Sequence, residues 1–275
     1  MGNPKLSIIT INLNNKEGLQ KTIKSVISQT FIDYEYIIID GLSTDGSVEV
    51  IEEYSNNIRY WVSEPDKGIY NAMNKGIKQA QGDYILLLNS GDYLIDETIV
   101  KKAVDFGLDS DIVYGNILWE ENNSTYCTTF PEKLRFSYFW TDTLGHSTTF
   151  IKRELHTNIG LYLETKKIVS DWCFFIQAIC QYNCSYKHIP ITIACCNRDG
   201  ISCKPENGTL IFEERIAFLK QEFPLYINDY EEIDQIKKEI ADLRLSNENN
   251  NRTINIFKKT IKHILGIASI IKKVK

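Results

Sequence analysis

The stretch that decides the fold is Tyr84-Ile85-Leu86-Leu87-Leu88-Asn89-Ser90-Gly91-Asp92. Its first five residues are a short apolar run, which is typical of a buried strand. The polar residues that follow therefore emerge at the carboxyl end of that strand, where open α/β sheets bind their ligands. Asp92 can hold a divalent cation there, because hard cations take oxygen ligands. Taken alone, however, the stretch is better explained as a polar turn in which Gly91 supplies the backbone conformation.

Three strand-and-helix units precede this stretch. Strand patterns occur at 6–11, 34–40 and 58–63, and apolar residues at helical spacing follow each of them. The apolar positions of the three expected helices are Leu19, Ile23, Val26 and Ile27, then Val48 and Ile51, then Ile69, Met73, Ile77 and Ala80. Parallel neighbours need crossover connections, so the alternation predicts an α/β fold with a mostly parallel central sheet and helices on both faces.

Polar residues follow the strands of this predicted sheet. Asn12, Asp40, Asp66 and Asp92 all lie in segments that leave a strand at its carboxyl end. Since those ends meet at one edge of a parallel sheet, we expect the four side chains to gather there and form a pocket. Asp45 is better explained as a turn or helix-start residue.

Composition indicates an ordinary globular protein. Hydrophobic residues make up 43% of the 275 residues and charged residues 24%, which excludes disordered, collagenous and membrane-embedded classes. The first apolar run is too short for a signal peptide or a membrane span, so we expect a cytoplasmic protein. The seven cysteines lack paired Cys-x-x-Cys spacing, which favours buried reduced thiols over a zinc or redox site.

The second half carries fewer signals. The aromatic run at 136–140 has no clear period and fits core packing and an acceptor-facing wall equally well. His146 enters a β-like run, and a lone histidine is more often structural than catalytic. Asp171 and Trp172 begin a helical pattern, where a carboxylate is also favoured by the helix dipole. The segment 197–202, which ends at Ser202, is expected to be a loop.

The C-terminal region is distinct in charge. Residues 252–275 hold seven lysines and arginines and no acid, although the whole chain has a net charge of −5. The acidic body excludes nucleic acid as a partner, and the tail is expected to bind an anionic membrane surface as a basic amphipathic helix. The alternative is a helix that packs on the domain or in a homodimer.

Several long motifs in the right order resemble those of the family 2 glycosyltransferases with a GT-A fold, particularly the bacterial branch that builds surface polysaccharides. The resemblance covers about residues 6–202. It rests on Leu-Ser-Ile-Ile-Thr at 6–10, Ser-Val-Ile-Ser-Gln-Thr at 25–30, Ile-Ile-Asp-Gly-Leu-Ser-Thr-Asp-Gly-Ser at 38–47, Ser-Glu-Pro-Asp-Lys-Gly-Ile-Tyr-Asn-Ala-Met-Asn-Lys-Gly at 63–76, and Leu-Asn-Ser-Gly-Asp at 88–92.

The resemblance implies an inverting transfer of a hexose or N-acetylhexosamine from a nucleotide-diphosphate donor, expected to be a UDP-sugar. The acceptor would be a hydroxyl of a lipid-linked or saccharide molecule in surface-polysaccharide synthesis, such as capsule or lipopolysaccharide. Asp171 takes the place of the catalytic base, and Asp92 that of the ligand to Mg2+ or Mn2+. The nucleotide side would comprise Thr10, Asn12, Asp40, Asp66, Lys67, Asn89 and Asp92, while His146, Trp172 and Ser202 would lie near the acceptor or the diphosphate.

The same resemblance divides the chain at 1–110, a nucleotide-sugar-binding half, and 111–225, an acceptor-binding and catalytic half of the same domain. Residues 226–275 would form C-terminal helices with the basic tail, on the inner face of the plasma membrane. Asn89 and Gly91 stand where many members have aspartates. An alternative is therefore an inactive nucleotide-sugar or glycan-binding protein of the same fold. A nucleotide-sugar pyrophosphorylase or a Rossmann dehydrogenase fits less well, and for the dehydrogenase no Gly-x-Gly-x-x-Gly follows the first strand.

Overall fold

The computed structural model describes residues 2–121, 124–198 and 200–246. The chain divides into two units, Met1–Arg215 and Ile216–Lys275. The first unit contains the sheet, and helix α8 (Gly208–Glu222) runs across the boundary. The second unit also contains a helix over residues 224–246.

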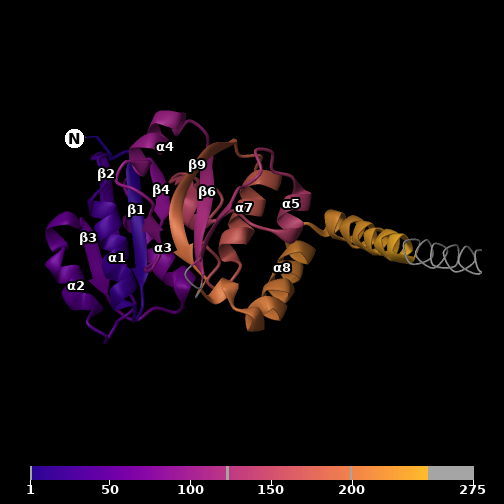
Figure 1. Cartoon of the computed structure of the whole chain (residues 1–275), viewed down its shortest axis with the longest axis horizontal. Helices are drawn as coiled ribbons and strands as arrows, with labels where there is room; N and C mark the ends of the chain where they lie inside the picture. Colours follow the sequence, from indigo (N-terminus) through magenta and orange to yellow (C-terminus); the bar gives the residue numbers. More distant parts are fainter. Residues whose placement is uncertain (1, 122–123, 199, 247–275) are drawn as a thin grey trace, which may run out of the picture. The chain divides into compact units, whose positions relative to one another are not determined.

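The first half of the sheet has the predicted alternation of strands and helices. Its parallel strands lie in the order β3-β2-β1-β4, and Figure 1 shows them side by side. The elements are β1 (Leu6–Asn12), α1 (Lys16–Ile27), β2 (Tyr34–Asp40), α2 (Ser47–Glu53), β3 (Tyr60–Ser63), α3 (Ile69–Gln79) and β4 (Tyr84–Leu87), with a 3-10 turn η1 (Ser55–Asn57).

Helices pack on both faces of these strands because strand side chains alternate between the faces. Leu6 and Ile8 of β1 share a buried cluster with Leu19 of α1. On the other face, α3 approaches β1 so closely that a Cβ at Gly76 would lie 2.4 Å from Ile9. Glycine is therefore required at this contact between helix and sheet.

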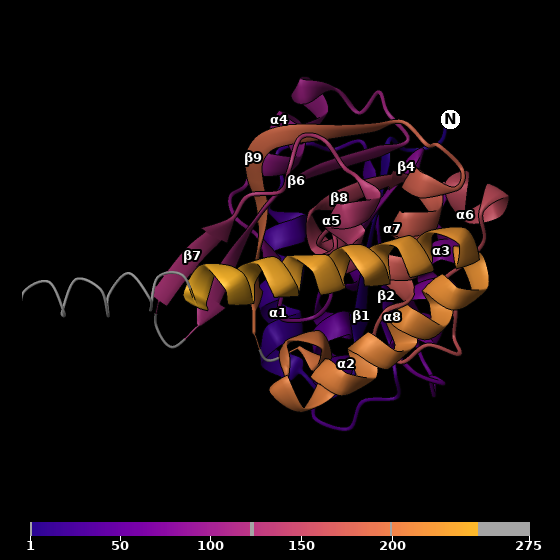
Figure 2. The same cartoon turned by 90° about the vertical axis from the view of Figure 1, so that its right-hand side faces the viewer.

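The second half extends the sheet with mixed pairing, in which β8 runs antiparallel to both β4 and β6, and β9 runs parallel to β6. The full order is β3-β2-β1-β4-β8-β6-β9-β5, and β7 pairs with the end of β6 to form a hairpin (Figure 2). The elements are β5 (Tyr93–Leu94), α4 (Ile99–Gly107), β6 (Ile112–Glu121), β7 (Ser124–Thr128), α5 (Phe136–Thr141), η2 (His146–Thr148), β8 (Thr149–Lys152), α6 (Leu155–Asn158), α7 (Ser170–Cys180), β9 (Tyr186–Asn197), η3 (Ile201–Cys203) and η4 (Pro205–Asn207).

Two segments differ from the sequence expectation. The aromatic run at 136–140 lies in the short helix α5, which is too short to show a helical period. In the sequence, Pro190 separates two strand-like runs at 186–189 and 191–196, but in the structure both belong to one continuous strand, β9. Pro190 has no N–H to donate to a ladder, and the register between β6 and β9 shifts near it, so the pattern looked interrupted.

Three further points concern predictions made for the whole chain. All seven cysteines are free. No helix within the described ranges is long and apolar enough to cross a membrane. The predicted basic tail at 252–275 lies outside the described residues.

Candidate active site

The ends of β1, β2 and β3 bring together a buried polar cluster. Asn12 pairs with Asp40 in the sheet register, and Asp40 pairs with Ser63. Asp40 is fully buried, and its carboxylate accepts hydrogen bonds from Asn12 Nδ2 (2.8 Å), Ser63 Oγ (2.6 Å), Ser43 Oγ (2.6 Å) and the Ser43 N–H (2.9 Å). Burial works to raise the pKa of Asp40, but these hydrogen bonds hold it below its ordinary value. The cluster is therefore a hydrogen-bonded, negatively charged group of side chains at this edge of the sheet.

The other residues predicted on the nucleotide side lie in different surroundings. Thr10 is fully buried, and its hydroxyl lies 2.9 Å from the hydroxyl of Tyr36. Asp66 forms an ion pair of 2.6 Å with Lys75. Lys67 is exposed, and its backbone N–H donates to Asn71. The structure thus brings Asn12 and Asp40 into direct contact, whereas Thr10 lies inside the sheet.

The turn at 88–92 is held by helix α1 and strand β1. The Ser90 N–H donates to the carbonyl of Ile11, and Asn15 Nδ2 donates to the carbonyl of Ser90 (3.0 Å). The hydroxyl of Thr22 donates to the carbonyl of Asp92 (2.6 Å) and accepts from the Gly91 N–H. Gly91 has φ of +101°, a conformation that favours glycine. The turn is therefore a fixed backbone platform.

The antiparallel pairing of β4 and β8 explains how His146 reaches this turn. Residues that precede β8 lie beside those that follow β4, since Leu86 pairs with Phe150. His146 Nε2 lies 3.0 Å from Asn89 Nδ2, and His146 Nδ1 lies 3.2 Å from Asp171 Oδ2. An amide nitrogen only donates, so Nε2 accepts and Nδ1–H donates to the carboxylate. A single hydrogen-bond chain therefore joins the 88–92 turn to Asp171.

Asp171 lies in the first turn of α7, and both oxygens of its carboxylate accept hydrogen bonds. Besides His146, its carboxylate lies 3.0 Å from the Tyr70 hydroxyl and accepts the N–H of Trp172 (2.9 Å). Burial works to raise the pKa of Asp171, but His146 and these two donors hold it below its ordinary value. Burial works to lower the pKa of His146, and Asp171 together with the charge of Asp92 raises it. The pair favours an ionised carboxylate that touches an imidazole.

Trp172 serves the core rather than the surface of this cluster. Its side chain is 1% exposed, its indole N–H donates to the carbonyl of Phe139 (2.8 Å), and Arg215 lies over its ring at 5.0 Å. Trp172 contacts the predicted base through its own backbone N–H.

Asp92 lies in an environment unlike that of the other carboxylates. Burial raises the pKa of Asp92 above its ordinary value, against the lowering effects of the His146 charge and of hydrogen bonds from Cys196 and Ser147. Within the described residues, no group of three or more His, Cys, Asp or Glu side chains could hold a metal ion. Asn89 Oδ1 is buried and has no hydrogen-bond partner there. Two oxygens from protein side chains suit a cation that takes its other ligands from phosphates and water.

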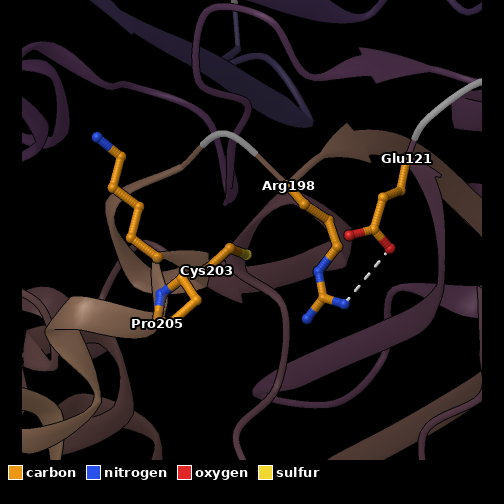
Figure 3. A pocket seen from close by; sticks show the side chains of 5 residues that line it. Glu121, Arg198, Cys203 and Pro205 are labelled. Atoms are coloured by element: carbon orange, nitrogen blue, oxygen red, sulfur yellow. Dashed lines mark ion pairs between the residues drawn. The ribbon is translucent and has the colours of Figure 1, made fainter.

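A hollow of about 560 Å3 lies beside the loop that follows β9 (Figure 3). Arg198 points across it toward Glu121 (3.7 Å) and lies about 6 Å from the rings of Trp119 (5.9 Å) and Tyr126 (6.0 Å). Ser202 is exposed and precedes one of the lining residues. The residues that line the hollow are Glu121, Arg198, Cys203, Lys204 and Pro205.

Sequence reasoning missed four residues that hold the site together. Ser43 and Ser63 donate to Asp40, Tyr70 contacts Asp171, and Asn15 holds the 88–92 turn. The first three lie inside the long motifs at 38–47 and 63–76. These motifs marked the region as functional but did not indicate what each of the three residues does. Asn15 caps helix α1 by accepting the Gly18 N–H, and no local sequence signal marks its second contact, with Ser90.

Comparison with known proteins identifies the family of the chain. The model of "Glycosyl transferase family 2" matches residues 7–161. An uncharacterised glycosyltransferase of Mycobacterium tuberculosis is 32% identical over 212 residues, which is 70% of this chain and 73% of the relative. A PGL/p-HBAD biosynthesis glycosyltransferase of Mycobacterium bovis is 28% identical over 207 residues, covering 73% of this chain and 79% of the relative.

Solved structures support the fold. Residues 1–349 of Staphylococcus aureus TarS with UDP align with a TM-score of 0.59 at 20% identity, over 70% of this chain and 60% of that chain. The mannosyltransferase PcManGT of Pyrobaculum calidifontis, with GDP-Man and Mn2+, aligns with a TM-score of 0.54 at 16% identity, over 82% of this chain and 65% of that chain. The matched region thus spans less than two thirds of these solved chains, and the predicted GT-A fold is confirmed. Because the family model covers more than half of the sequence, the chain belongs to glycosyl transferase family 2 and is a glycosyltransferase.

Proposed function

We propose that this glycosyltransferase moves a hexose or N-acetylhexosamine from a UDP-sugar to a hydroxyl of a lipid-linked or saccharide acceptor, with inversion. The observation that carries the proposal is the hydrogen-bond chain Asn89–His146–Asp171. It fixes a partly buried carboxylate beside the turn that would hold the diphosphate, which is the arrangement that a direct displacement needs. The TarS structure with UDP supports a uridine nucleotide as the donor.

In this proposal Asp171 accepts the proton of the acceptor hydroxyl as its oxygen attacks the anomeric carbon, while the bond to the diphosphate breaks on the opposite face. Its low pKa keeps Asp171 ionised at neutral pH, so it is ready to accept. The attacking hydroxyl becomes strongly acidic as its bond to carbon forms, so a weak base suffices late in the step. Tyr70 can then donate to the carbonyl of Ile168 alone, which leaves the Trp172 N–H as the remaining donor to Asp171 Oδ1.

Asp40 and Asn12 would contact the nucleoside, and the 88–92 turn would meet the ribose and the diphosphate. Asp92, with the unpaired Asn89 Oδ1, would hold Mg2+ or Mn2+. A bound cation would neutralise the charge that develops on the leaving diphosphate. The Mn2+ in the PcManGT structure supports a cation in this fold.

A variant of the base tests the proposal. We expect Asp171→Asn to lower the rate of sugar transfer by roughly 100- to 10,000-fold, the usual contribution of a general base. UDP binding in the presence of Mn2+, measured by calorimetry, should stay within a few-fold of the wild type. Asp105→Asn is a matched control, because this exposed α4 carboxylate pairs only with Lys101 on the surface. Full turnover by Asp171→Asn would remove Asp171 as the base. A wild-type chain that binds UDP but transfers no sugar would favour the inactive binding protein.

We further propose that the chain works in surface-polysaccharide synthesis on the cytoplasmic face of the plasma membrane, held there by residues 252–275. The basic amphipathic pattern of the tail supports this. Removal of residues 251–275 should abolish co-sedimentation with vesicles that contain anionic lipid. Equal binding by the shortened chain would exclude the tail as the anchor.

A further inference from the structure

The helix over residues 224–246 of the second unit carries an exposed apolar stripe; it is drawn in the orange to yellow part of Figure 2. Ile233, Ile236, Ile240 and Leu243 are 42%, 47%, 44% and 64% exposed. Their spacing of three, four and three residues places them on one side of the helix. A helix of this length gains most of its stability from packing its apolar side, so an open stripe of large aliphatic residues requires a partner.

The spacing is that of the a and d positions of a seven-residue repeat. Ile233 and Ile240 take position a, and Ile236 and Leu243 take position d. Only the second repeat, Ile240 with Leu243, has the combination that favours two-stranded coiled coils, whereas the first repeat has isoleucine at both positions, which favours larger bundles. The stripe is confined to the a and d positions and has charged residues at e and g, and so narrow a stripe suits one partner helix. The stripe thus has the form of a seam for one other helix.

The charges that flank the seam identify that helix. Glu232 and Glu239 take position g on one side, and Lys237 and Arg244 take position e on the other. All four side chains are exposed, and none of them forms an ion pair within the described part of the chain. Their partners are therefore expected on another helix with the matching pattern, and the chain itself supplies that pattern.

We infer that residues 232–244 form a parallel two-stranded coiled coil with a second copy of this chain. In a parallel pair, position g of one helix faces position e of the next repeat on the other. Glu232 then meets Lys237 of the second copy, and Glu239 meets its Arg244. An antiparallel pair would place glutamate against glutamate and base against base, which is repulsive. The charge pattern selects both the partner and its direction.

The opposite side of the helix consists mainly of polar and charged side chains. Asp234, Gln235, Lys238 and Asp242 lie there, and Lys238 pairs with Asp234 at 3.7 Å. Leu245 is the apolar exception on that side.

Charge reversal in the full-length chain tests the inference. Sedimentation equilibrium of the wild type between roughly 1 and 100 μM should show an average mass that rises with protein concentration toward twice 31.7 kDa. Glu232→Lys with Glu239→Lys makes both flanks basic, and Lys237→Glu with Arg244→Glu makes both acidic. Each double variant should raise the dissociation constant by roughly 100-fold, because every interhelical pair becomes repulsive. An equimolar mixture of the two should recover a dimer, since an acidic helix then faces a basic one.

Asp234→Lys with Asp242→Lys is the matched control, because it changes the net charge by the same amount on the opposite side of the helix. It should leave the dissociation constant unchanged. A wild type that stays monomeric over the whole range would overturn the inference, as would a trimeric mass or a mixture that fails to associate. Equal loss of dimer in the control variant would also overturn it, because net charge rather than the seam would then be responsible.

Discussion

Acidification from pH 7 to pH 5 is expected to destabilise the chain through His156. This side chain is 5% exposed, stacks on Phe174 at 4.7 Å and meets the edge of Tyr162 at 5.4 Å. Burial among these rings lowers the pKa of His156 to about 4. The folded chain therefore resists a proton that the unfolded chain accepts readily.

The size of the effect follows from the two pKa values. An unfolded histidine titrates near 6.5. Because the folded pKa is lower, the stabilisation is complete above about pH 6.5 and is lost as the pH falls toward 4. With about 1.4 kcal/mol for each pKa unit, the loss between pH 7 and pH 5 is roughly 2 kcal/mol, out of a total near 5–15 kcal/mol for a typical domain.

Urea denaturation of the wild type and of His156→Phe at both pH values measures this loss. The phenylalanine keeps the ring stack but cannot take a proton, so its unfolding free energy should fall by about 2 kcal/mol less than that of the wild type on acidification. If that variant does not fold, His156→Gln provides the same comparison. His188, whose pKa is lowered, and His146, whose pKa is raised, titrate in both proteins and cancel in the difference. Equal losses in the wild type and the variant would refute the reasoning.

Three further predictions concern the candidate site. Asp40→Asn replaces one acceptor oxygen of the cluster at the ends of β1 to β3 with an NH2 donor that faces other donors, so the unfolding free energy should fall by about 1–3 kcal/mol in urea and UDP should bind more weakly by calorimetry. Asp92→Asn should abolish any enhancement of UDP binding by Mn2+, yet leave stability unchanged or higher, because burial already disfavours its charge. Gly91→Ala should cost about 1–2 kcal/mol by the same urea assay, since φ of +101° strains an L residue, and a preserved stability would show that the turn can relax.

The strands and helices of the first hundred residues could be predicted well because each of them is indicated by the pattern of its own residues. Apolar runs alternate with helical spacing, and parallel strands leave little freedom in where their carboxyl ends meet. Asn12 and Asp40 were accordingly expected together, and their side chains hydrogen bond at 2.8 Å.

The contacts of His146 could not be predicted in the same way. They depend on the pairing of β8 with β4, strands separated by more than sixty residues of chain, and nothing in the local pattern encodes that pairing. Tyr70 is similar: its hydroxyl reaches Asp171 across 101 positions of sequence. Local sequence patterns predict the helices and strands and the edge of the sheet where parallel strands end. Hydrogen bonds between segments far apart in the sequence depend on the tertiary packing, which those patterns do not specify.

The contact between Asn89 and His146 links the orientation of the Asn89 side-chain amide to the protonation state of the imidazole. The neutral ring presents a lone pair at Nε2, which the amide N–H satisfies. A doubly protonated ring presents an N–H there instead, and the amide must turn over so that Oδ1 accepts it. The buried Oδ1 then gains the partner that it lacks, and the amide N–H group takes its former place. The buried position that Oδ1 occupies would thus change from a hydrogen-bond acceptor to a donor without any movement of the backbone.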